Sequence, residues 1–122
     1  TDYKIWTHNH KVKMFQIVFW KDNKRQRCFY NLNWEKMPFS IYEAPSEINF
    51  QKPKLFNEMI ELSEKIAKYF KFLRVDLYTN NKSIYVGELT NHPGNHGDIF
   101  LDQDGQYVGF DKEKEYSKLF FD

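Results

Sequence analysis

Residues 72–94 read FLRVDLYTNNKSIYVGELTNHPG, and this stretch decides how the fold is interpreted. Two strand-like segments, residues 72–79 and 84–90, flank an Asn-Asn turn signal, a pattern that predicts a β-hairpin. Both predicted strands carry charged side chains among apolar ones. Because a charge that is buried without a partner is costly, each of them needs an opposite charge, a metal ion or a solvated cleft.

The charges of the predicted hairpin are Arg74 and Asp76 in its first strand and Glu88 in its second. Side chains alternate along a strand, so Arg74 and Asp76 share a face, and the place of Glu88 depends on the register. A three-residue loop puts Arg74 opposite Glu88, and a five-residue loop pairs Asp76 with Glu88. A two-residue loop turns Glu88 to the other face. The register therefore decides between one site and unrelated charges.

Converging carboxylates at Asp76 and Glu88, with Arg74 nearby, would suit a hard divalent cation. Mg²⁺ typically takes one or two carboxylates together with substrate phosphates. The guanidinium can then contact a phosphate or a developing oxyanion. The alternative interpretation is a surface ion-pair cluster on a half-exposed sheet, without chemistry.

The spacing Arg74-x-Asp76, then Glu88 and Asn91-x-Pro93-Gly94, resembles the C-terminal signature of ATP-grasp ligases. The closer resemblance is to the TupA-like ATP-grasp family, which is linked to surface-polysaccharide and teichuronopeptide synthesis. Segments similar to that family occur in the same order over most of the chain, at residues 2–4, 29–34, 74–78, 85–90 and 93–94.

The resemblance implies that Asp76 and Glu88 hold Mg²⁺ at the ATP phosphates. It also implies that Arg74 stabilises an acyl phosphate or a tetrahedral intermediate. Many ATP-grasp enzymes have an Asn two residues after the Glu. Here Thr90 stands in that place and Asn91 follows it, so we name Asn91 as the third ligand, with Thr90 as its rival.

Two residues near the N-terminus complete the site that the resemblance implies. Lys4 would contact a phosphate, and Asp2 would contact a ribose hydroxyl. Residues 21–27 are predicted to form a basic loop, in which Arg25 or Arg27 is a second candidate for contact with a phosphate or an anionic acceptor. Solvated surface positions are the alternative for all four residues.

Composition bounds the possible partners of the chain. Its 122 residues include 18 basic and 17 acidic side chains. This balance does not indicate nucleic acid or an anionic membrane as a binding partner. Cys28 is the single cysteine, so no intrachain disulfide is expected. No run of about 18 apolar residues predicts a transmembrane helix, and we expect a cytoplasmic protein.

The remaining elements are predicted from local pattern. One helix, residues 53–70, carries an apolar stripe and is expected to pack on the back of the sheet. Residues 92–98 are expected to form a mobile polar loop with surface histidines. Strands are expected at residues 3–8, 12–20 and 28–34, and an irregular loop at residues 35–53. A hairpin is expected at residues 99–110, followed by a short helix up to residue 120 that Asp111 caps.

Together these patterns predict an α+β fold, with an antiparallel sheet, one long packing helix and a cleft lined by the charged hairpin. By resemblance, residues 1–122 are a C-terminal lobe of an ATP- and Mg²⁺-dependent carboxylate–amine ligase. The N-terminal lobe is missing from this chain, so the isolated chain is expected to bind Mg-ATP weakly and to be inactive. The alternative is a noncatalytic nucleotide- or glycan-binding module with the same fold.

Overall fold

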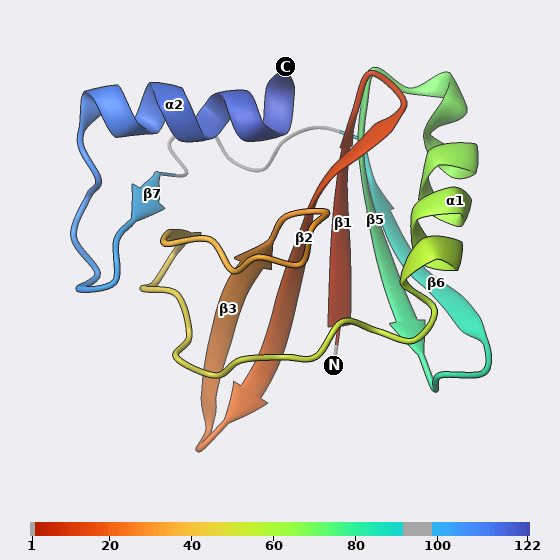
Figure 1. Ribbon diagram of the computed structural model, residues 1–122, viewed down its shortest axis with the longest axis horizontal. Coiled ribbons are helices and arrows are strands. Elements are labelled where there is room, and N and C mark those ends of the chain that lie inside the picture. Colours follow the sequence, from red (N-terminus) through yellow and green to blue (C-terminus); the bar gives the residue numbers. More distant parts are fainter. Residues whose placement is uncertain (1, 92–98) are drawn as a thin grey trace.

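Five antiparallel strands form the central sheet of the computed structural model, which describes residues 2–91 and 99–122. Their order across the sheet is β3-β2-β1-β5-β6 (Figure 1). Together with two α-helices, this sheet confirms the predicted α+β class. The strands of the sheet are β1 (Asp2–His8), β2 (Lys11–Lys21), β3 (Lys24–Tyr30), β5 (Phe72–Thr79) and β6 (Ile84–Thr90).

Two-residue turns connect the first three strands. Asn9-His10 joins β1 to β2, and Asp22-Asn23 joins β2 to β3; all four residues have positive φ. Turns of this kind match the twist of a hairpin and favour Asn and Asp. The prediction of a basic loop over residues 21–27 was therefore wrong, since β3 already begins at Lys24 and places Arg25 and Arg27 on the sheet.

One face of the sheet is covered by α1 (Phe56–Ile66), which continues into a 3₁₀ turn, η1 (Ala67–Tyr69). The predicted back-face packing is confirmed, although the α-helix starts three residues after Pro53. Phe56 and Met59 of α1 join a buried cluster from the sheet. Its strand members are Ile5, Val12, Phe15, Ile17, Cys28, Tyr30, Leu73, Val75 and Leu77.

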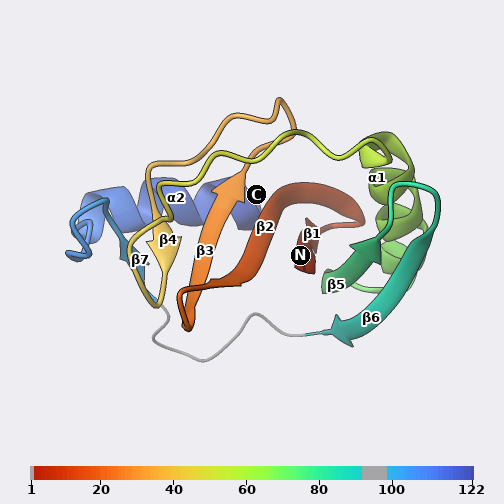
Figure 2. The same ribbon diagram turned by 90° about the horizontal axis from the view of Figure 1, so that it is seen from below.

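The opposite face has its own core beneath α2 (Phe110–Phe121) and the small sheet of β4 (Ser40–Ile41) and β7 (Phe100–Leu101). The capping prediction for Asp111 was wrong, because Gly109 is the N-cap and makes no side-chain capping bond. Figures 1 and 2 show the two helices at different ends of the sheet. The core beneath α2 contains Trp6, Met14, Phe29, Phe39, Ile41, Phe100 and Phe120.

The chain from β4 to α1 runs along one side of the molecule and is largely irregular, as predicted (Figure 2). Two hydrogen bonds anchor it at Phe50: the Phe50 amide donates to the hydroxyl of Tyr30 in β3 at 2.9 Å, and Trp34, in the turn after β3, donates its indole N–H to the Phe50 carbonyl at 2.9 Å. The residues predicted as a polar loop, 92–98, lie outside the described residues. The part of the sheet that α2 does not cover carries the charged side chains.

Candidate functional site

The register of the 72–90 hairpin brings two carboxylates to the same face. Asp76 of β5 pairs directly with Glu88 of β6. The loop that joins the strands has four residues, because Thr79 pairs with Ile84, and so none of the three predicted loop lengths is found. The pairing nevertheless equals the one expected from a five-residue loop.

A β-bulge explains this agreement. Leu77 pairs with Val86, but the next pair is Asp76 with Glu88, so Gly87 is an extra residue in β6. Without the bulge, Asp76 would face Gly87, and Glu88 would point to the α1 side of the sheet. A Cβ atom added to Gly87 would collide with the ring of Tyr78, so a glycine suits the bulge.

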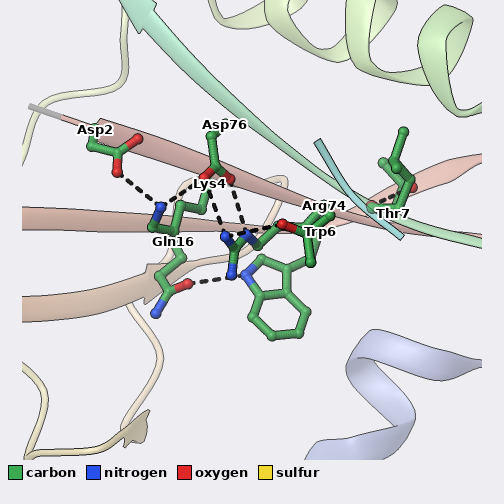
Figure 3. A network of polar contacts seen from close by, with 9 residues as sticks. Asp2, Lys4, Trp6, Thr7, Gln16, Arg74 and Asp76 are labelled. Carbon is green, nitrogen blue, oxygen red and sulfur yellow. Dashed lines mark hydrogen bonds and ion pairs between the residues drawn. The ribbon is translucent and has the colours of Figure 1, made fainter. Parts of the chain in front are cut away.

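The Asp76 carboxylate is the centre of a buried ionic network (Figure 3). Its Oδ2 atom accepts a hydrogen bond from Lys4 Nζ at 2.7 Å, and its Oδ1 atom accepts one from Arg74 Nε at 2.9 Å. Only 3% of the Asp76 side chain is exposed, and the two cations supply the partners that such burial requires. Lys4 Nζ also lies 2.9 Å from Asp2 Oδ2.

Arg74 extends the network toward β6. It pairs with Thr90 across the two strands, and its Nη2 atom lies 3.4 Å from the Thr90 hydroxyl oxygen. Thr90 therefore shares the face of Glu88 and Arg74. Asn91 is exposed and follows the end of β6. Of the two candidates for the third ligand, Thr90 is the one that a described contact joins to the network.

A hollow of about 400 Å³ opens beside this network. Lys4, Arg74 and Glu88 line it, and four residues that the sequence did not single out contribute to its walls: Trp6, Gln16, Ile41 and Tyr42. Gln16 was detectable as the single polar residue inside an otherwise apolar run, residues 14–20. The hollow is lined by Lys4, Trp6, Gln16, Arg25, Arg27, Ile41, Tyr42, Arg74 and Glu88.

Glu88 differs from Asp76 in its surroundings. It is exposed, and its carboxylate has no hydrogen-bond or ion-pair partner within residues 2–91 and 99–122. The same described residues contain no group of three or more His, Cys, Asp or Glu side chains that could hold a metal ion. Two paired carboxylates still fit Mg²⁺ when phosphate oxygens supply further ligands, which is its usual mode of binding to proteins.

An α+β sheet domain with paired carboxylates and two cations beside a hollow is suited to hold metal-bound phosphate groups. The model of the TupA-like ATPgrasp family matches residues 1–109, and the chain belongs to this family. Comparison with curated proteins and with solved structures gave no significant match. Family membership indicates an ATP-grasp fold of the ligase type. In the part of the chain that the structure describes, no helix is long and apolar enough to cross a membrane.

Proposed function

We propose that this chain is the phosphate- and metal-binding lobe of an ATP- and Mg²⁺-dependent carboxylate–amine ligase. The observation that carries the proposal is the direct pairing of Asp76 with Glu88 on the face that bears Lys4 and Arg74. Membership of the TupA-like ATP-grasp family supports the same reaction class.

The reaction transfers the γ-phosphoryl group of ATP to a substrate carboxylate and leaves ADP. An amine then attacks the acyl carbon, an amide bond forms, and inorganic phosphate leaves while the amine loses a proton. Mg²⁺, when bound, neutralises charge on the phosphates. The residues of this chain would bind and orient the reactants for both steps.

Each site residue has a role in this proposal. Asp76 and Glu88 are the metal ligands, with Asn91 or Thr90 as the third. Arg74 is held by Asp76 and faces the hollow, where its guanidinium would stabilise negative charge on the acyl phosphate or on the tetrahedral intermediate.

Lys4 and Asp2 are proposed to bind the nucleotide. Lys4 lines the hollow, and its Nζ would contact a phosphate. Asp2 would accept a hydrogen bond from a ribose hydroxyl, because its buried Oδ1 atom has no partner within the described residues while Oδ2 is paired with Lys4. A buried acceptor without a partner is costly, and a ligand hydroxyl would satisfy it.

The wider context of the proposal follows from the family. We propose that the amide decorates a cell-surface polysaccharide or a teichuronopeptide, and that the reaction runs in the cytoplasm, where ATP is available. The N-terminal lobe, which would supply further phosphate-binding lysines, is proposed to come from the rest of the protein. The 122-residue chain alone would therefore bind Mg-ATP weakly and turn over nothing.

The test is a titration of the chain with Mg-ATP, in which calorimetry measures the binding. Glu88→Gln removes a ligand that has no structural partner among the described residues, so we expect binding to weaken by about tenfold while the fold is kept. The matched control is Glu61→Gln, the same change at an exposed position of α1, which should bind as the wild type does. Equal affinity of Glu88→Gln and wild type would exclude the metal-ligand role.

One observation favours a second candidate, a noncatalytic nucleotide- or glycan-binding module. Both Asp76 oxygens already have cationic partners inside the protein, which is also the arrangement of a purely structural ion cluster. Under this alternative, Glu88→Gln leaves the output of the full-length protein unchanged, and Asp76→Asn changes it only as far as the lost ion pairs destabilise the fold. A glycan-binding role would appear in a saccharide titration as a tryptophan fluorescence change that ATP does not reproduce.

A further inference from the structure

Gln16 presents an unused hydrogen-bond donor to the hollow beside the ionic network. It is 2% exposed and lines that hollow. Trp6 donates its indole N–H to the Gln16 side-chain oxygen at 3.1 Å, as Figure 3 shows. An indole nitrogen can only donate, so this contact fixes the orientation of the amide and leaves its NH₂ group turned from Trp6. Within the described residues, that NH₂ group has no protein acceptor.

The position of Gln16 places this donor next to the proposed phosphate and metal site. Gln16 of β2 pairs with Lys4 of β1, Lys4 pairs with Asp76 of β5, and Asp76 pairs with Glu88 of β6. The four side chains therefore form one row across the sheet on a single face. Gln16 is the member of the row that lies farthest from the carboxylate pair.

Arg25 lines the same hollow and lies on the same face of the sheet as Gln16. It is exposed and has no ion-pair partner within residues 2–91 and 99–122. Its neighbour Arg27 differs, because one of its nitrogens contacts both Glu43 oxygens, at 2.6 and 2.7 Å. Arg25 also lines a second hollow, of about 450 Å³. It therefore lies where the two hollows meet.

We propose that this wall of the hollow binds the acidic substrate, and that the substrate carries a second carboxylate besides the reacting one. The Gln16 amide donates to the reacting carboxylate next to Lys4, and Arg25 binds the second carboxylate. Along this wall Gln16, Arg25 and Arg27 all present donors, which favours a ligand rich in acceptors. The inference rests on the proposed function and adds the class of substrate, a polycarboxylate.

The test uses tricarballylate as the probe and acetate, at equal ionic strength, as the monocarboxylate control. In the ¹⁵N-labelled chain, tricarballylate should shift the side-chain NH₂ signals of Gln16 and the Nε signal of Arg25 at concentrations where acetate does not. Arg25→Gln should weaken tricarballylate binding by about tenfold. Lys24→Gln is the matched control, since it removes the same charge one residue away on the opposite face of β3.

Three results would overturn the inference. If Arg25→Gln and Lys24→Gln weaken tricarballylate binding equally, the loss of positive charge explains the effect and Arg25 makes no specific contact. If tricarballylate does not shift the Gln16 NH₂ signals, the Gln16 amide does not contact the bound carboxylate. Competitive displacement of tricarballylate by Mg-ATP would assign the whole hollow to the nucleotide.

A Mg-ATP titration of Arg25→Gln separates this inference from the proposed function. The variant should bind Mg-ATP as the wild type does, because Arg25 lies outside the network of Lys4, Arg74 and Asp76. If the wild type binds Mg-ATP but not tricarballylate, the substrate inference fails and the proposed function stands. If it binds tricarballylate but not Mg-ATP, the proposed function fails.

Discussion

Glu88 lies directly opposite Asp76 because one extra residue, Gly87, is inserted into β6 between the hairpin loop and the site. The four-residue loop on its own would turn Glu88 to the α1 side of the sheet. The bulge therefore decides which face carries the second carboxylate. It sits next to the site, a position at which bulges commonly re-aim a side chain.

Replacement of Gly87 by Ala should destabilise the chain by about 1 kcal/mol, because the new Cβ atom displaces the Tyr78 ring from its position. Tyr78 is 46% exposed, so its ring can move away at moderate cost. In a Tyr78→Ala background, Gly87→Ala should be neutral or stabilising, since glycine itself weakens a strand. Urea unfolding of the wild type, the two single variants and the double variant measures this coupling, and additive effects would contradict it.

The two carboxylates should differ in their effect on stability. Asp76→Asn leaves Lys4 and Arg74 without their shared counter-ion at a buried position, so we expect a loss of about 3 kcal/mol. Glu88→Gln should change the free energy of unfolding by less than about 0.5 kcal/mol, because Glu88 is exposed and has no partner among the described residues.

Denaturant unfolding of both variants checks this difference. Equal losses in the free energy of unfolding would mean that Glu88 takes part in the structural network. Glu88→Gln could then not be used to test metal binding alone.

The indole N–H groups of Trp6 and Trp34 provide a matched pair. Trp6 donates to Gln16, and Trp34 donates to the Phe50 carbonyl. Trp6→Phe leaves a buried acceptor without its donor, and Trp34→Phe leaves a part-buried one, so each should cost about 1 kcal/mol. Only Trp6→Phe should also weaken tricarballylate binding, since it alone releases the Gln16 amide. Equal binding by the two variants would show that the amide orientation has no role.

Cys28 should make stability depend on pH in the alkaline range. It is fully buried, and burial raises the pKa of its thiol from 9.0 to about 11, against a smaller opposing effect of Lys36. The folded state thus holds this proton more tightly than the unfolded state. The stabilisation is fully present below pH 9 and is lost as the pH rises toward 11, by about 2 kcal/mol at pH 11.

Urea unfolding of the wild type and of Cys28→Ala, from below pH 9 up to pH 11, isolates this contribution. The alanine variant is less stable throughout because of the cavity, but its stability should fall less steeply above pH 9. Parallel curves would contradict the assignment to Cys28.

Local pattern in the sequence predicted much of the fold. Alternation along β1 separates Tyr3 and Ile5 from Lys4 and Trp6, and the apolar stripe of α1 indicates that this helix packs on the sheet. These features depend on residues close in the chain. The ordered motifs also identified the family, which the match over residues 1–109 confirms.

Features that depend on distant or irregular parts of the chain were predicted poorly. The start of β3 was missed because Lys24 to Arg27 are polar, although they pair with β2 in regular register. The α2-side core was not predicted either, since it joins Trp6 to Phe39, Phe100 and Phe120 from separate parts of the sequence.

The sequence by itself determined that this is an α+β ATP-grasp chain with charges on two adjacent strands. Only the tertiary structure decided which charges meet, because a one-residue bulge reverses the face of a strand and leaves the alternation of residue types unchanged. It also placed Gln16 beside Lys4 and brought Arg25 to the same hollow, since β2, β3 and β1 come together only when the sheet forms.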